Sequence, residues 1–153
     1  MKIIVISDSH GNSKGIDKLF SDKNFDYLFF LGDGLSDLGT YINMENVIVV
    51  SGNCDFFSKV VNEKYFELQN KKIFMTHGNK YGVKSSLNSL IEKSKQLNAD
   101  IVFYGHTHKQ KIDKFGDIFY INPGSFSKNV RGKSTGLEIE IIGSNIIINK
   151  IEV

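Results

Sequence analysis

Continuous hydrophobic runs, each ending at a glycine or a polar residue, recur through the first two thirds of the chain. Runs of this kind are typical of strands that are covered on both faces. They are Lys2–Ser7, Asp26–Leu31, Val47–Val50, Lys72–Met75 and Ile101–Tyr104. We therefore expect a largely buried sheet structure whose strands stop at short polar turns.

Helical spacing is visible between some of these runs. Ile16, Leu19 and Phe20 fall on one face of a segment that follows the first run. A second pattern extends over roughly fifteen residues and predicts the clearest helix of the chain. Its hydrophobic positions are Val83, Leu87, Leu90, Ile91 and Leu97. A short helical turn is also expected near residues 36–42.

Alternation of hydrophobic and polar residues replaces the continuous runs elsewhere. Residues 65–69 alternate and predict a half-exposed strand before the run at residue 72. Residues 110–121 predict a hairpin around Gly116-Asp117, and residues 136–153 predict another around Gly143-Ser144-Asn145. The front half thus has strand–helix–strand order and the back half is mainly hairpins, which indicates one α/β domain over residues 1–153 with two sheets.

Composition narrows the functional classes only a little. The chain has 153 residues, 41% of them hydrophobic and 24% charged, and a formal net charge of +2, which gives no strong signal for nucleic-acid binding. Cys54 is the only cysteine, so no intramolecular disulfide can form. The hydrophobic run at the N-terminus is about five residues, against about 20 in a membrane-spanning helix. We expect a cytoplasmic protein without a membrane segment.

Residue types that bind metals follow the predicted strands. All four histidines belong to this set, which comprises Asp8, His10, Asp33, Asn53, His77, His106 and His108. A single such residue is usually a turn or cap residue. The carboxyl ends of strands in open α/β sheets form ligand sites, however, so the whole set together indicates a metal site.

Six motifs carry a resemblance to a known family. They are DSH at 8–10, GDG at 32–34, GNCD at 52–55, THG at 76–78, GHTH at 105–108 and NPGS at 122–125. As an ordered set they resemble the calcineurin-like metallophosphoesterases, and the small YfcE-type phosphodiesterases in particular. The resemblance implies a metallophosphatase-type four-layer αββα sandwich of two mixed β-sheets flanked by helices.

The resemblance also implies a site with two divalent metal ions. Asp8, His10 and His108 would hold one ion, Asn53, His77 and His106 would hold the other, and Asp33 would bridge them. Asp33, Asn53, His77 and His106 would be the catalytic residues. On family grounds we expect Mn²⁺, with Zn²⁺, Ni²⁺, Fe²⁺ and Co²⁺ left open.

The implied activity is hydrolysis of a small phosphodiester by a metal-bridging hydroxide that attacks phosphorus in line. A non-catalytic scaffold of the same fold, as in the small subunit of the retromer coat, and a phosphomonoesterase or nucleotidase remain alternatives. A homo-oligomer is left open as well.

The chain departs from larger members of the family at one position. Cys54 stands where they carry a histidine that assists the leaving group, and a thiol is a poor proton donor at neutral pH. We therefore expect substrates with good leaving groups, such as aryl or nucleotide phosphodiesters. Cys54 and Asn12 are candidate substrate-binding residues, although Asn12 or Ser13 fits a helix cap equally well. Arg131 could contact a phosphate, but a surface role is the better interpretation.

Overall fold

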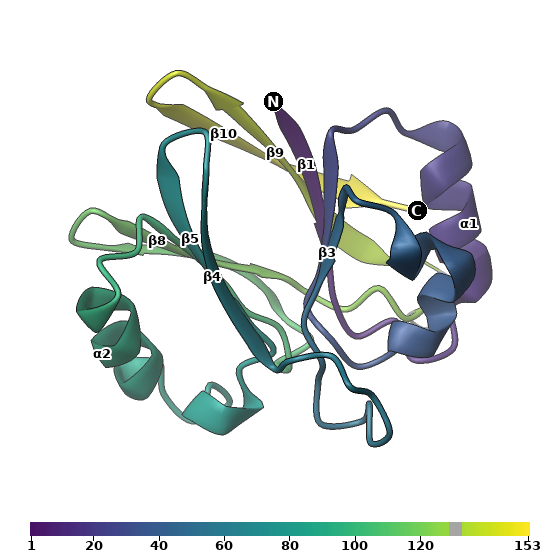
Figure 1. The fold of residues 1–153 in the computed structure, drawn as a ribbon, viewed down its shortest axis with the longest axis horizontal. Helices are drawn as coiled ribbons and strands as arrows, with labels where there is room; N and C mark the ends of the chain where they lie inside the picture. The colour runs from purple at the N-terminus through teal and green to yellow at the C-terminus, as the bar shows by residue number, and fades with distance from the viewer. Residues whose placement is uncertain (129–132) are drawn as a thin grey trace.

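The computed structural model describes residues 1–128 and 133–153, and the strands in these residues form two five-stranded sheets (Figure 1). The first sheet has the order β10-β9-β1-β2-β3 and the second has the order β4-β5-β6-β8-β7. The first consists of β1 (Lys2–Ile6), β2 (Tyr27–Phe30), β3 (Val47–Val49), β9 (Thr135–Ile142) and β10 (Asn145–Glu152). The second consists of β4 (Glu63–Leu68), β5 (Lys71–Thr76), β6 (Ile101–Phe103), β7 (Gln110–Phe115) and β8 (Ile118–Pro123).

Both sheets are mixed. The strands β1, β2 and β3 run parallel, as do β5, β6 and β8, and the remaining neighbours are antiparallel. Figure 1 shows helix α1 (Ser13–Asp22) and the 3-10 helix η1 (Leu35–Asn43) on the outside of the first sheet. Helix α2 (Asn88–Gln96) and the short 3-10 turn η2 (Asn79–Tyr81) lie on the outside of the second. The expected four-layer αββα sandwich is therefore confirmed.

The layers explain the continuous hydrophobic runs. Because side chains alternate along a strand, Ile3 and Val5 of β1 pack between the two sheets, while Ile4 and Ile6 pack against α1 and η1. In β6, Phe103 likewise faces the first sheet and Val102 faces α2. Strands in the middle of this sandwich need hydrophobic residues on both faces.

The helix expected from Val83 to Leu97 is shorter than predicted. Val83 is buried, but it lies in a turn that begins at Gly82, whose carbonyl accepts from the backbone N–H groups of Ser85 and Ser86. The Ser86 hydroxyl then accepts from the backbone N–H of Asn88, the first residue of α2. The hydrophobic spacing was thus a correct guide to burial and a wrong guide to where the helix begins, since local hydrogen bonds compete with the first helical turn.

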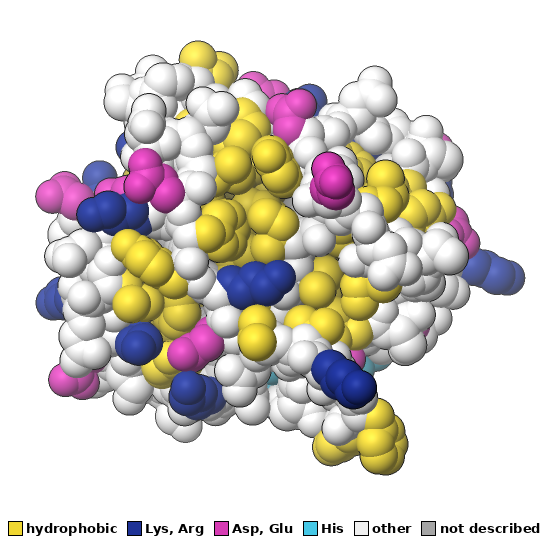
Figure 2. Space-filling view, in the orientation of Figure 1, with side chains coloured by type: hydrophobic (Ala, Val, Ile, Leu, Met, Phe, Trp, Pro, Cys, Tyr) yellow, Lys and Arg dark blue, Asp and Glu magenta, His cyan; other side chains and the backbone are white. Residues whose placement is uncertain are grey.

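Hydrophobic side chains reach the surface in two places in the view of Figure 2. They are visible in the centre, where the edge strands β3 and β4 leave the layer between the sheets open. They also project at the lower right, where the β3–β4 loop carries Phe56 and Phe57 with 80% and 100% of their surface exposed. In the described part of the chain, no helix is both long and apolar enough to cross a membrane.

Candidate metal centre

The candidate ligands lie on loops that directly follow strands of both sheets. Backbone hydrogen bonds tie these loops together. The N–H of Asp8 donates to Gly32 O at 2.9 Å, and the N–H of Gly105 donates to His77 O at 3.0 Å. The N–H of His106 donates to the Asp8 carboxylate at 3.1 Å and so links the second sheet to the first. The site is thus built where the two sheets meet.

Left-handed backbone conformations are concentrated at this place. Asp8, His10, Asp33, His106 and His108 have φ values of 54°, 40°, 60°, 67° and 58°. A residue other than glycine rarely adopts such values, and each costs on the order of 1–3 kcal/mol unless its surroundings impose it. Strain at five candidate ligands indicates that the fold holds their side chains in a required direction.

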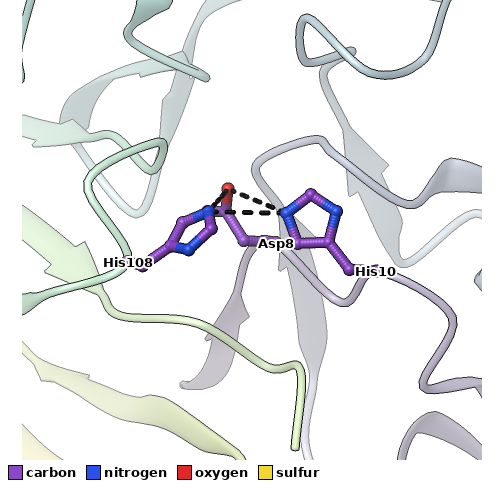
Figure 3. Close-up of side chains that lie close together, drawn as sticks. All are labelled: Asp8, His10 and His108. Atoms are coloured by element: carbon purple, nitrogen blue, oxygen red, sulfur yellow. Dashed lines mark hydrogen bonds and ion pairs between the residues drawn. The ribbon is translucent and has the colours of Figure 1, made fainter. Parts of the chain in front are cut away.

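The first group of ligand atoms comprises Asp8, His10 and His108, which point toward one another in Figure 3. Asp8 Oδ1 lies 3.0 Å from His108 Nε2 and 3.9 Å from His10 Nε2, and the two imidazole nitrogens are 3.4 Å apart. Asp8 is fully buried, and its Oδ1 has no hydrogen-bond partner among the described residues. A buried, unpartnered carboxylate oxygen faced by imidazole nitrogens fits a bound cation.

The other carboxylate oxygen of Asp8 is already engaged. Its Oδ2 accepts from the Ser7 hydroxyl at 2.5 Å and from the backbone N–H of His106. These two bonds fix the carboxylate plane and leave Oδ1 directed at the imidazoles. The Ser7 bond lies within the loop after β1, whereas the His106 bond comes from the loop after β6, so the orientation of Asp8 depends on contact between the two loops.

The second group comprises Asp33, His77 and His106. Asp33 Oδ2 lies 3.3 Å from His77 Nε2, which lies 3.2 Å from His106 Nδ1. His77 is fully buried, and its Nδ1 lies 2.7 Å from the carbonyl oxygen of Leu31. Because the Leu31 carbonyl can only accept, Nδ1 donates to it, and in neutral His77 the lone pair is therefore on Nε2, the atom that faces the group.

All the distances between ligand atoms given above have the spacing of ligands around one ion, except the 3.9 Å between Asp8 Oδ1 and His10 Nε2. With metal–nitrogen bonds of ~2.1 Å, neighbouring ligand atoms are about 3.0–3.4 Å apart. Asp33 also connects the groups, since its Oδ2 is 4.0 Å from His10 Nε2. Its Oδ1 accepts from the backbone N–H of Cys54 at 2.7 Å. The residues present therefore fit two neighbouring divalent cations.

The electrostatics of the site favour an ionised Asp33 and a neutral imidazole at His106. Partial burial opposes ionisation of Asp33, but hydrogen bonds from His77 and from the Cys54 backbone outweigh it and hold the pKa of this carboxyl well below its ordinary value. Burial also opposes protonation of His77, yet Asp33 and Asp8 raise its pKa. The pKa of His106 is lowered by burial, His77 and Lys84. A site with this negative charge attracts cations.

Cys54 lies at the rim of the same site. The Cys54 sulfur atom and one ligand atom each of His10 and Asp33 all lie within 4.8 Å of one another. Desolvation and the carboxylates of Asp33 and Asp55 raise the pKa of the Cys54 thiol. The sulfur is therefore protonated at neutral pH, where it is a poor nucleophile, and a substrate-binding role for Cys54 stays a prediction.

Two other sequence-based expectations had a less direct outcome. Asn53 is exposed and its amide donates to Cys54 Sγ at 3.5 Å, and in the described residues no hydrogen bond joins it to His77 or His106. Asn12 is the N-cap of α1, because its Oδ1 accepts from the Gly15 N–H. Its Nδ2 donates to Phe126 O and Ser134 Oγ. A ligand role for Asn53 and a substrate-binding role for Asn12 stay predictions, and Arg131 lies outside the described residues.

Four polar residues that support the ligand loops were not identified from the sequence. Asn122 donates to Gly105 O at 2.9 Å and to Thr107 Oγ1 at 3.1 Å, and the Ser125 hydroxyl donates to Asp8 O at 2.9 Å. Asp37 accepts from Ser9 and Gly11, and Asp55 accepts from four backbone N–H groups. The sequence did contain one indication of this role. Each of the four residues lies within a few residues of a glycine in a strand-end turn, where Asp, Asn and Ser side chains often bind backbone groups.

The fold is that of a metallophosphatase-type α/β sandwich, with carboxylates and imidazoles gathered where its two sheets meet. The family model of the calcineurin-like phosphoesterase superfamily domain matches residues 1–141. The chain belongs to this family.

Proteins of similar sequence occur in bacteria. A protein of Bacillus subtilis named "Probable metallophosphoesterase YsnB" is 32% identical over 128 residues, which cover 82% of this chain and 75% of that protein. "Phosphodiesterase YfcE" of Escherichia coli is 29% identical over 155 aligned residues, with 83% of this chain and 80% of that protein covered. The resemblance to YfcE-type proteins is thereby confirmed.

Solved structures show the same fold. A predicted phosphoesterase from Streptococcus pneumoniae has a TM-score of 0.86 and 29% identity, with 98% of this chain and 88% of that chain covered. Vps29 from Entamoeba histolytica, solved with Zn²⁺, has a TM-score of 0.77 and 20% identity, with 99% of each chain covered. The likeness to Vps29 shows the fold alone.

Proposed function

We propose that this protein is a phosphodiesterase that depends on two divalent cations bound at the candidate metal centre. The observation that carries the proposal is the pair of ligand groups, Asp8–His10–His108 and Asp33–His77–His106, with Asp33 Oδ2 placed between them. Asn53 is proposed to complete the second group. Mn²⁺ is the cation we expect on family grounds.

Divalent cations held by these residues would supply a hydroxide nucleophile and would polarise the phosphoryl oxygens of the substrate. The protein contributes orientation. Asp33 presents a single oxygen, Oδ2, to both groups, because the backbone N–H of Cys54 occupies Oδ1. The carbonyl of Leu31 holds His77, and the Ser7 hydroxyl holds Asp8.

A cavity beside His10 supports a small anionic substrate. It has a volume of about 370 Å³, within the usual range for small-molecule sites. Lys14 and Lys128 bring positive charge to its lining, and no carboxylate is among its lining residues. A phosphodiester whose phosphate lies at the metal centre has two substituents, and we propose that this cavity takes one of them.

The weak acidity of the Cys54 thiol is the basis of the proposed preference for the leaving group. Cys54 occupies the rim near His10 and Asp33, and its raised pKa makes it a weaker acid than an ordinary thiol. A diester with an aryl or nucleotide leaving group needs less protonation as its bond to phosphorus breaks. We propose that such diesters are cleaved faster than diesters of simple alkyl alcohols.

The test is hydrolysis of bis-p-nitrophenyl phosphate by purified protein with added Mn²⁺, compared with p-nitrophenyl phosphate under the same conditions. Diester hydrolysis should be abolished by EDTA and by His106→Ala, while Thr40→Ala, an exposed residue of η1, is the control with unchanged activity. Equal hydrolysis by the parent and the His106→Ala variant would refute the proposal. Faster monoester hydrolysis would instead favour a phosphomonoesterase.

The scaffold alternative makes a different prediction about metal content. An interaction scaffold does not need both ligand groups occupied, whereas diesterase chemistry does. Elemental analysis of protein dialysed against Mn²⁺ should find close to two ions per chain. A cytoplasmic location and a homo-oligomer stay predictions.

A further inference from the structure

We propose that Asp55 is a positioning residue whose carboxylate holds the backbone of the Asp33 loop in the conformation that presents Asp33 to the metals. The inference deepens the function proposed above and rests on the same metal centre. Asp55 is the last residue of the GNCD motif in the β3–β4 loop.

The carboxylate of Asp55 accepts hydrogen bonds from four backbone N–H groups. Oδ2 accepts from Asp33 and Gly52, both at 2.8 Å, and Oδ1 accepts from Gly34 and Leu35, both at 3.0 Å. Three of the four donors are consecutive residues of the loop after β2. Bonds from neutral N–H groups to a carboxylate are stronger than those between neutral partners.

The three consecutive donors form an anion-binding concavity. Asp33 and Gly34 have φ values of 60° and 133°, and such backbone values turn successive N–H groups toward one point. Without an anion at that point, three N–H dipoles would face one another and lack partners. The left-handed conformation of Asp33 is thus stabilised by a carboxylate that is not itself a candidate ligand.

The loops after β2 and β3 are too close for a side chain to lie between them. A Cβ added at Gly32 would lie 2.4 Å from Gly52 N, and one added at Gly52 would lie 2.2 Å from Asp33 Oδ1. The β3–β4 loop therefore binds Asp33 at two points, its backbone N–H and its side chain. Asp55 binds its backbone, and the Cys54 N–H binds its Oδ1, so that Oδ2 faces His77 and His10.

Asp37 provides a matched comparison, because it performs a similar role for another loop. Its Oδ2 accepts from the Ser9 hydroxyl at 2.5 Å and from the Gly11 N–H at 2.8 Å, on either side of His10. Asp37 is thus expected to act on the His10 group, whereas Asp55 acts on Asp33, which belongs to both groups. Loss of Asp55 should weaken both metal sites, and loss of Asp37 should weaken mainly one.

The experiment measures Mn²⁺ binding to metal-free protein by isothermal titration calorimetry for the parent, Asp55→Asn, Asp55→Ala and Asp37→Asn. In Asp55→Asn the amide keeps the shape but replaces one acceptor oxygen with a donor, which would face backbone N–H groups. We expect affinity at both sites to fall by about 10- to 100-fold, the range found when a partner of a ligand is lost.

Chemical rescue separates positioning from general stability. Asp55→Ala leaves the concavity without its anion, so added formate should recover at least a third of the lost affinity on a logarithmic scale. It should not recover affinity in Asp55→Asn, where the amide fills the space, and titration of the parent with formate is the control. Should Asp55→Ala fail to fold by circular dichroism, the Asp55→Asn titration decides alone.

Parent-like Mn²⁺ affinity in Asp55→Asn would overturn the inference, as would a folded Asp55→Ala that formate does not rescue. Activity separates this result from the function itself. A parent protein that binds two Mn²⁺ ions, with Asp55→Asn weakened, but cleaves no phosphodiester would refute the proposed function and leave the role of Asp55 intact.

Discussion

Gly105→Ala is expected to destabilise the protein through one specific contact. Gly105 separates strand β6 from His106, and a Cβ placed on it would lie 2.1 Å from Ser7 Oγ, 2.9 Å from Asp8 Oδ2 and 3.1 Å from Ser7 Cβ. The φ of Gly105 is not in the left-handed range, so alanine is acceptable to the backbone itself. The cost therefore comes from the clash across the two sheets.

The loss of stability in Gly105→Ala can be estimated from the displacement of Ser7 that the added methyl group requires. Forcing an extra methyl group into a packed site costs about 1–3 kcal/mol. Displacing Ser7 also weakens its hydrogen bond to the buried Asp8 carboxylate, and such bonds to charged groups contribute about 1.5–3 kcal/mol. The two costs overlap, so we expect a total of about 3 kcal/mol. For a chain of this length, that lowers Tm by about 6–12 °C.

The assay is thermal unfolding of metal-free protein in EDTA, followed by circular dichroism. Gly116→Ala is the control, because Gly116 has a φ of +61° and nothing within 4 Å of an added Cβ. It should lose only the ~1–2 kcal/mol of a left-handed alanine. A double variant, Ser7→Ala with Gly105→Ala, removes the atom in closest contact and should be more stable than the sum of the single effects predicts.

Two results would refute this reasoning. One is a Gly105→Ala variant that unfolds within about 2 °C of the parent. The other is additivity of the Ser7 and Gly105 substitutions to within about 0.5 kcal/mol, the behaviour of independent sites. Either result would mean that the loops can separate without loss of packing.

Three further predictions address the ligands, the pH dependence and the core. His106→Ala and His108→Ala should each remove one of the two proposed Mn²⁺ ions, and the two variants should lose the ion of different ligand groups. Metal analysis with electron paramagnetic resonance checks this, and loss of both ions from either variant would contradict it. Burial opposes ionisation of Glu63, but a hydrogen bond from Tyr81 at 2.6 Å and the charge of Lys80 outweigh it and lower the pKa of Glu63. The ionised Glu63 therefore stabilises the fold fully above the unfolded-state pKa of 4.5, and this stabilisation is lost as pH falls through the folded-state pKa. Tyr81→Phe should thus lower Tm by about 2–4 °C at pH 7 and by less at pH 3, and an equal decrease at both would be inconsistent with this linkage. Phe103→Ala, at a fully buried position edge-to-face with Phe29, should cost about 3–5 kcal/mol in urea unfolding, and a loss below 1 kcal/mol would show that the core can collapse around it.

The strand positions and the set of candidate ligands could be predicted from local sequence. A strand covered on both faces needs a continuous hydrophobic run, so β1, β2 and β6 were visible directly. The chain must also turn at a strand end, where glycine and polar residues are required, so Asp8, Asp33 and His77 were visible by position. The arrangement of these residues as two metal groups came from the family resemblance, and the assignment of each ligand to a metal stays a prediction.

Tertiary structure alone decided the contacts that join distant segments. Asp55 could be read only as part of a turn, because its partners at Asp33, Gly34 and Leu35 lie about twenty residues earlier in the chain. The helix start at Asn88 was hidden for a different reason, since hydrophobic spacing reports burial and not the backbone hydrogen bonds of Gly82 and Ser86. Hydrophobic pattern determines which face of each element is buried, but long-range polar contacts fix the direction of each ligand, and these form only when both sheets are in place.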